Sequence, residues 1–305
     1  SYSIALGTTA LDAITTGDSN VALGYNALTA ATNNAGNVAI GDSAMVASAN
    51  DADYNVAIGY YALGSTDVSG DFNIGIGPQA GYNITSGHSN IAIGYNAMYT
   101  GDPVTGARNI GIGRESMRSI AGGEMNVCVG DVSGYALTSG DKNVGIGSNA
   151  LAANSAGDNN TAIGYCALQD ATGSKSVAIG YDAAKEYTHN DPIVAIGYAA
   201  LDACINGYGN TAVGTNALTN NVSGYRNVAV GEAALISGTS NYNTGVGYAA
   251  LSSSTAAWNT AVGANALTAN TGGEYNVAVG YNALDANVGG SNNVAVGKDA
   301  AGSNT

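Results

Sequence analysis

The stretch Asn37-Val38-Ala39-Ile40-Gly41 decides the fold of this chain, because the same five-residue phrase recurs from one end of the sequence to the other. Each copy ends on a glycine, the marker glycine, and successive marker glycines are 16 to 19 residues apart, most often 17. A fixed period of this kind indicates a structural unit that buries its apolar face by stacking on its neighbours. The sequence therefore predicts a single repeat solenoid domain over residues 1–305. The eighteen marker glycines are at positions 7, 24, 41, 59, 77, 94, 113, 130, 147, 164, 180, 197, 214, 231, 247, 263, 280 and 297.

The residues before each marker glycine, taken as position 0, predict a β-strand. Position −3 is Val, Ile or Thr and position −1 is Leu, Ile or Val in all eighteen copies, whereas position −2 is Ala, Gly or Cys. This alternation of large and small side chains has the period of two that is typical of a strand, and a glycine in every repeat argues against a helix. The sequence thus predicts an all-β fold, a parallel β-roll or β-helix solenoid of about eighteen coils of ~17 residues.

The residues after each marker glycine predict a second element. Position +3 is Ala in sixteen copies, and position +4 is usually Leu or Met. We expect a second short strand or a bend here, entered through the glycine corner. The remaining positions hold mostly Ser, Thr, Asn, Asp and Gly, which is the composition of turns.

Asparagine occupies position −4 in fifteen copies, and the exceptions are Ser3, Ser176 and Ile193. When coils stack in register, equivalent side chains lie about 4.7 to 4.8 Å apart, and amides at that spacing can form a hydrogen-bonded ladder. We therefore predict a structural role for this column.

The small side chains at position −2 favour a close contact with another chain, with Ala22, Ala39, Ala212 and Ala229 as candidate interface residues. The alternative is that this column faces the interior of a narrow coil and the bulky column faces a partner. Both alternatives bury one face of the strands between chains.

Position −5 is the most variable, and variability beside constant core positions suggests an outward-facing edge. Its aromatic residues could stack on sugars or other apolar surfaces, or they could cover neighbouring turns or the chain interface. The candidate surface-recognition edge consists of Tyr54, Phe72, Tyr242, Trp258 and Tyr275.

Composition excludes several classes of partner. The formal charge is −14 with only eight Lys and Arg residues, which argues against nucleic acid. No apolar run approaches the ~20 residues that span a bilayer, so we expect no membrane insertion. Cys128, Cys166 and Cys204 lie at different repeat positions and cannot all pair within one chain, so we interpret them as substituted small residues.

No pattern predicts a catalytic, cofactor or metal site. The Gly-x-Gly triplets arise where glycine replaces alanine at position −2, and His88 and His189 lie several coils apart. The Gly-Asp-x-Asn turns at Gly17, Gly70, Gly140 and Gly157 are similar to calcium-binding turns but lack the denser carboxylate set. The prediction is a structural, non-enzymatic protein without a cofactor.

The repeated phrase resembles the Asn-Ser-Val-Ala-Ile-Gly repeats of YadA-like heads in trimeric autotransporter adhesins. The longer unit over 157–168, Gly-Asp-Asn-Asn-Thr-Ala-Ile-Gly-Tyr-Cys-Ala-Leu, is similar to the arrays in phage tail fibres. This resemblance implies a left-handed parallel β-roll assembled as a homotrimer. It also implies an extracellular function: the shaft of a virion tail fibre that serves host attachment. The alternatives are a bacterial surface adhesin head and a self-stacking extracellular filament subunit. The expected partners are other copies of the chain and a host-surface glycan or protein.

The two ends also lie within the repeat. The chain begins at Ser1 without an initiator Met or a secretory segment, and neither end shows the atypical residues of a capping repeat. We therefore expect either a segment of a longer fibre or subunits that stack head to tail.

Overall fold

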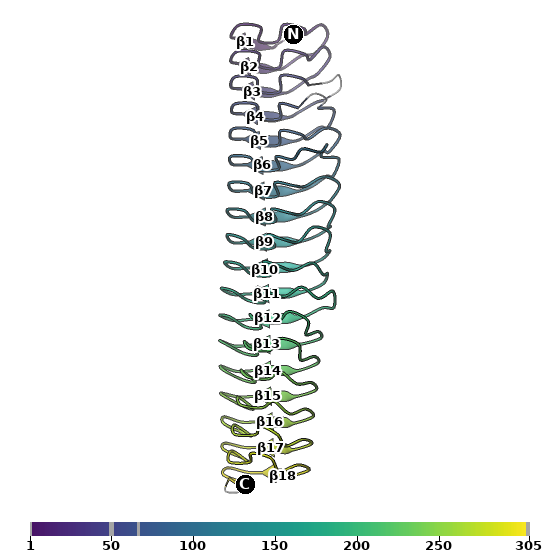
Figure 1. Ribbon diagram of the computed structural model, residues 1–305. Coiled ribbons are helices and arrows are strands. Elements are labelled where there is room, and N and C mark those ends of the chain that lie inside the picture. The colour runs from purple at the N-terminus through teal and green to yellow at the C-terminus, as the bar shows by residue number, and fades with distance from the viewer. Residues whose placement is uncertain (1, 49–51, 66–67, 303–305) are drawn as a thin grey trace. The chain divides into compact units, whose positions relative to one another are not determined.

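The computed structural model describes residues 2–48, 52–65 and 68–302, and it is all-β in these ranges (Figure 1). The chain divides into two compact units, Ser1–Asp158 (unit 1) and Asn159–Thr305 (unit 2). Among the described residues each unit contains nine strands, and each strand pairs in parallel with the strand of the next coil in its unit. The predicted parallel β-solenoid is therefore confirmed.

Every strand consists of positions −3 to −1 of its repeat. In unit 1 the strands are β1 (Ile4–Leu6), β2 (Val21–Leu23), β3 (Val38–Ile40), β4 (Val56–Ile58), β5 (Ile74–Ile76), β6 (Ile91–Ile93), β7 (Ile110–Ile112), β8 (Val127–Val129) and β9 (Val144–Ile146). In unit 2 they are β10 (Thr161–Ile163), β11 (Val177–Ile179), β12 (Val194–Ile196), β13 (Thr211–Val213), β14 (Val228–Val230), β15 (Thr244–Val246), β16 (Thr260–Val262), β17 (Val277–Val279) and β18 (Val294–Val296).

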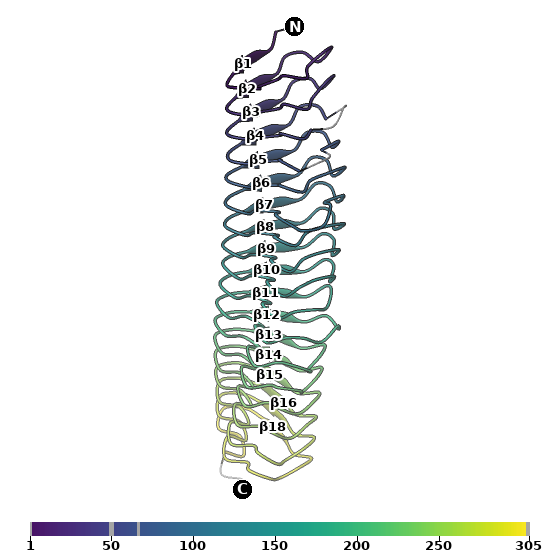
Figure 2. The ribbon, with the colours of Figure 1, turned by 45° about the horizontal axis from the view of Figure 1, so that its top comes forward.

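The register of the sheet follows the repeat. In unit 2, Ala212 pairs with Ala229 and Val213 with Val230, so identical repeat positions lie side by side. The backbone hydrogen bonds between neighbouring strands continue into the marker glycine, because the Gly231 N–H donates to the Val213 carbonyl at 2.8 Å. Figure 2 shows the chain leaving each strand through a turn and returning to the next strand.

The marker glycine forms a sharp corner that no other residue type fits. Gly214 has φ +137°, and a Cβ on it would lie 2.5 Å from the carbonyl oxygen of Gly231 in the next coil. The conformation is strained for any residue with a Cβ, and the contact is with backbone that cannot move aside. Glycine at position 0 is therefore required by both backbone angle and coil spacing.

The element after the corner is a bend. Positions +2 and +4 have positive φ in most coils, as at Asn26 (53°) and Leu28 (49°), and the described residues contain no second strand there. These residues still bond between coils, since the Leu28 N–H donates to the Ala44 carbonyl at 2.9 Å. The bend thus turns the chain while it keeps the backbone paired.

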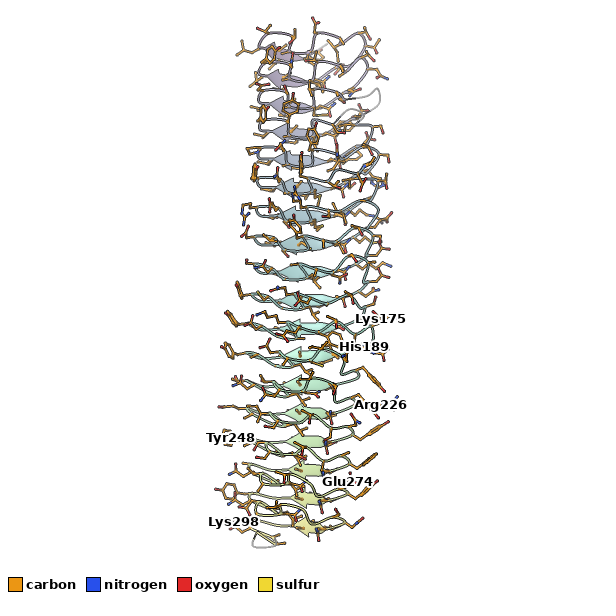
Figure 3. The ribbon with its side chains drawn as sticks, viewed as in Figure 1. Lys175, His189, Arg226, Tyr248, Glu274 and Lys298 are labelled. Atoms are coloured by element: carbon orange, nitrogen blue, oxygen red, sulfur yellow. The ribbon has the colours of Figure 1, made fainter. Side chains whose placement is uncertain are left out.

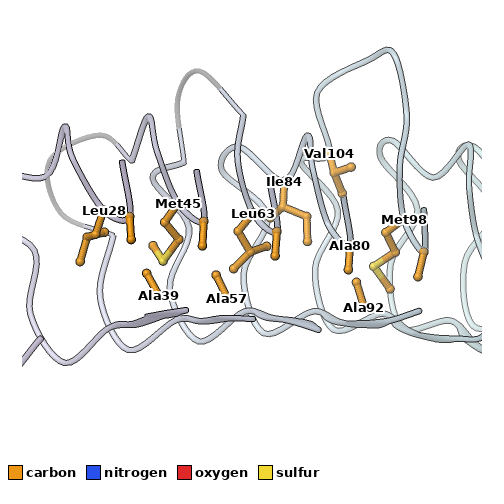
Figure 4. Packing of buried hydrophobic residues seen from close by; sticks show 14 of the residues in the cluster. Leu28, Ala39, Met45, Ala57, Leu63, Ala80, Ile84, Ala92, Met98 and Val104 are labelled. Carbon is orange, nitrogen blue, oxygen red and sulfur yellow. The ribbon is translucent and has the colours of Figure 1, made fainter. Parts of the chain in front are cut away.

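The interior of the coil is thin and apolar. In unit 1, Ala39, Ala57 and Ala92 point from the strands toward the side chains of the opposite bend, such as Met45 and Met98 (Figure 4). All five side chains are fully buried. An Ala on the strand facing a Leu or Met on the bend fills the space between the two walls.

The prediction that position −2 forms the chain interface is wrong. Ala22, Ala39, Ala212 and Ala229 are all 0% exposed within the single chain, so they cannot form a surface. They face the coil interior, where the side chains of the bend leave room only for a small residue (Figure 4). The outward side chains are the bulky ones at positions −3 and −1.

The asparagine column forms the predicted ladder. The Asn227 N–H donates to Asn210 Oδ1 at 2.9 Å, and Asn227 Nδ2 donates to the Ser240 carbonyl at 2.7 Å. Each amide therefore bonds to the coil on either side of it. The column is interrupted at Ile193, which has no side-chain acceptor, and no acceptor is found for the Asn210 N–H among the described residues.

Among the residues that the structure describes, none forms a helix long and apolar enough to cross a membrane.

Candidate functional site

The outward side of the strands presents a surface of mainly aliphatic side chains in each unit, with Thr at position −3 in four of the nine coils of unit 2. In every strand the residues at positions −3 and −1 are half-buried or exposed. The middle residue, at position −2, is buried in every strand except β1. Ile58, Val228 and Val279 are each 36% exposed. None of these positions carries a charged residue. Aliphatic side chains in contiguous columns form the kind of apolar surface that marks an interaction site.

The position −5 column borders this surface on one side. In unit 1, Tyr54 and Phe72 stack with ring centroids 5.4 Å apart and planes within 5°. Tyr54 also lies against the neighbouring coil, since a Cβ on Gly36 would be 2.6 Å from its ring. These two predicted residues are thus brought together, and each is more than half exposed.

In unit 2 the other three predicted residues form one ladder. Trp258 lies between Tyr242, with a centroid distance of 6.0 Å, and Tyr275, at 5.3 Å, and its ring plane is within 8° of that of each neighbour. Both faces of the Trp258 indole are covered by these neighbours, so its outward part is the ring edge. Stacking of a sugar on the Trp258 face would require the ladder to open.

The ladder extends to residues that the sequence interpretation missed. Tyr225 meets Tyr242 edge to face, and Tyr208 stacks on Tyr225 at 4.7 Å. The Arg226 guanidinium lies within 6 Å of both the Tyr208 and the Tyr242 ring centroids and donates to the Tyr242 hydroxyl at 2.8 Å. That hydrogen bond is the main cause of a raised Arg226 pKa. The signal in the sequence is the tyrosine at position −6 in two successive repeats.

A second aromatic column at position +1 borders the other side of the strands. Tyr181 stacks between Tyr165 and Tyr198, with centroid distances of 5.0 and 5.4 Å. In Figure 3, Tyr248 of this column lies on one side of the strands, whereas Lys175 and Arg226 of position −5 lie on the other. This column was also missed, although alignment of the repeats reveals it. Tyrosine occupies position +1 at residues 25, 60, 95, 165, 181, 198, 248 and 281.

The two flanking columns differ in charge, so we name them the cationic rim (position −5) and the tyrosine rim (position +1). The cationic rim holds four of the eight Lys and Arg residues and no Asp or Glu. The tyrosine rim holds three acidic and two basic residues among its tyrosines. The cations of the first rim are Arg108, Lys142, Lys175 and Arg226, and the charged residues of the second are Asp42, Arg114, Asp131, Glu232 and Lys298.

Together the outward face and its rims differ from the rest of the molecule. They contain 14 of the 21 aromatic residues and six of the eight cations, but only three of the 22 acidic residues. An aliphatic centre flanked by Tyr, Trp and Arg has the composition of a protein–protein interface, in which these residue types are enriched and Asp and Glu depleted.

A third aromatic series in unit 1 lies on the bends. Tyr61, Tyr82 and Tyr99 follow one another with centroid distances of 6.1 and 5.4 Å. Arg118 then lies between the Tyr99 and Tyr135 rings, within 6 Å of each centroid. Its residues are half-buried, and it covers the bends of adjacent coils.

The other candidates for chemistry are the histidine, cysteine and acidic side chains. In the described ranges no group of three or more His, Cys, Asp or Glu residues could hold a metal ion, and no pocket is found. Cys128, Cys166 and Cys204 are free and buried. Burial raises the pKa of Cys128 to about 12 and that of Cys204 to about 11, so both are protonated thiols at neutral pH.

No protein-family model matches this chain, and no curated protein is significantly similar to it.

Proposed function

We propose that this protein is structural and non-enzymatic, and that it forms the shaft of a phage tail fibre that serves host attachment. The observation that supports a fibre is the division of each repeat between two tasks. The inward residues join successive coils through the asparagine ladder and the small interior side chains, whereas the outward residues form an aliphatic surface that single chains leave in water. Such a surface favours self-association.

The assembly that we propose is a homotrimer of left-handed parallel β-rolls. Three chains that turn their aliphatic faces toward a common axis would cover positions −3 and −1 of every repeat. The acidic residues, most of which lie off this face, would then remain in water and keep the fibre soluble.

A bacterial surface adhesin head is the second candidate. The similarity of the repeated phrase to YadA-like heads favours it, and the same face would form the interface between chains. The two candidates differ in what lies beside the solenoid, a virion or a cell envelope.

Two measurements test the proposal. Sedimentation equilibrium of the purified chain should give three times the 30.0 kDa monomer mass. Immunogold microscopy with an antibody against the chain should label the tails of virions, and labelling of the cell envelope alone would support the adhesin instead. A monomer at micromolar concentration would contradict a self-associating shaft.

A further inference from the structure

We infer that the two rims meet across the interface between copies of this chain, so that the cationic rim of one copy packs against the tyrosine rim of the next. This inference rests on the self-association in the proposed function and adds which surfaces touch and in which orientation. The occupant of the outward face is a second copy of the chain, aligned in parallel.

The first argument is the unbalanced charge of the rims. On the cationic rim Arg108 forms an ion pair with Glu124 at 2.6 Å, whereas Lys142, Lys175 and Arg226 have no ion pair among the described residues. All three are exposed. Unit 1 thus has one exposed cation without an ion pair at position −5 and unit 2 has two, so each unit has positive charge that a carboxylate of a partner could balance.

The tyrosine rim carries a carboxylate and aromatic rings that can bind these cations. Glu232 is exposed and has no ion pair within the described part of the chain. The tyrosine rings of this rim can also accept a cation over the ring face. Arg226 already makes such contacts within its own chain, so the chemistry is established in this molecule.

The second argument is geometric. When two or three identical sheets pack around an axis parallel to the stacking direction of their coils, the rotation places the −5 edge of one copy beside the +1 edge of the next. In an antiparallel face-to-face pair, like edges meet. The antiparallel pair would set one cationic rim against another, and like charges in an interface oppose association.

In two coils of unit 2 the rims carry complementary groups at the same level. Position −5 and position +1 combine a cation with an acid at Arg226 and Glu232, and a cation with a tyrosine at Lys175 and Tyr181. The large Trp258 shares its level with the small Ala264. An in-register parallel neighbour would bring each of these pairs together.

Cysteine cross-linking tests which rims touch. The variant with both Arg226→Cys and Glu232→Cys is treated with a short bismaleimide and compared with each single variant and with the unsubstituted chain. The two positions border opposite sides of strand β14, and a cross-link within one chain would leave the mass of a monomer, so denaturing electrophoresis distinguishes it from a cross-link between chains. The unsubstituted chain controls for the buried native cysteines, and circular dichroism confirms folding of each variant.

We expect covalent trimers from the double variant and none from either single variant. Cross-linked dimers from a single variant would show that like rims meet and would overturn the inference. An oligomer by sedimentation that yields no cross-link would also overturn it, while leaving the proposed shaft intact. A monomer by sedimentation would instead contradict the proposed function itself.

Charge reversal gives an independent measurement. Arg226→Glu should weaken association, and the added Glu232→Arg should restore it. A surface ion pair contributes about 0.2–1 kcal/mol, so the expected change is roughly 1.4- to 5-fold in the dissociation constant. Equal weakening by the single and the double reversal would contradict direct contact between the rims.

Discussion

The inward and outward side chains of the same strand obey different constraints, although they are only one residue apart. At position −2 the chain tolerates Ala, Gly and Cys, because the strand lies close to the bend and the space between them is filled. At position −1 the side chain is always Leu, Ile or Val and remains partly in water. The inward columns therefore specify the coil, whereas the outward columns are free to specify a partner. The comparison predicts large effects of inward substitutions on stability and small effects of outward ones in the single chain.

The largest expected effect is at the corner that joins the two kinds of residue. Gly214→Ala combines a positive φ with a Cβ 2.5 Å from the Gly231 carbonyl oxygen, and we expect a loss of about 3–5 kcal/mol in the free energy of unfolding. The matched control is Gly272→Ala, where an added Cβ has no neighbour within 4 Å and the change should stay within about 0.5 kcal/mol. Urea unfolding of both variants measures the difference, and equal midpoints would show that the corner can relax.

The next effect concerns the asparagine ladder. Asn227→Ala removes the acceptor of the buried Asn243 N–H and the donor to the half-buried Ser240 carbonyl, and both backbone groups then lose their partner. The cost is about 1–3 kcal/mol for a buried group and less for a half-buried one, so we expect a loss of roughly 2–5 kcal/mol. Asn206→Ala, at an exposed turn, is the control and should be nearly neutral. A small effect at Asn227 would mean that water replaces the amide.

The two faces of one strand give the most direct comparison. Ala212→Leu overpacks a filled interior and should cost about 1–3 kcal/mol, whereas Val213→Leu on the outward side should change stability by less than about 0.5 kcal/mol. Thermal unfolding of the two variants under conditions that keep the chain monomeric separates them. If both substitutions cost the same, the outward face is already packed against something.

The sequence predicts much of the division of labour within each repeat. It also contains enough information to assign which strand side chains face inward. The repeat length, the three-residue strand and the ladder role of Asn227 and its equivalents follow from periodicity alone. The error lay in assigning Ala212 to a partner surface, whereas the ladder predicted for Asn210 and its equivalents was not assigned to either side of the strand. Positions −4 and −2 have the same parity, so in a strand their side chains point to the same side. An interior asparagine column therefore requires an interior alanine column.

Other features of the site depend on details that no local pattern contains. The αL conformation of Leu28 and its equivalents is imposed by pairing between coils, because leucine has no intrinsic preference for positive φ. The covered faces of Trp258 likewise depend on the residues one coil before and one coil after it. Sequence reasoning identified the exposed aromatic edge at position −5, but not that its rings face one another.

The smallest expected effect tests the ladder at its natural interruption. Ile193 cannot accept a hydrogen bond, so the Asn210 N–H has no acceptor among the described residues, whereas the Asn227 N–H is bonded to Asn210 Oδ1 at 2.9 Å. A typical hydrogen bond contributes about 0.5–1.5 kcal/mol, and if local opening controls exchange, the Asn210 amide should exchange with solvent roughly 2- to 12-fold faster than that of Asn227. Hydrogen exchange followed by NMR measures both amides in one experiment. The variant Ile193→Asn supplies the missing acceptor and should slow exchange at Asn210 while leaving Asn227 unchanged. Equal protection of the two amides in the unsubstituted chain would show that the ladder does not protect the coil, and that the backbone pairing of the strands alone holds successive coils together.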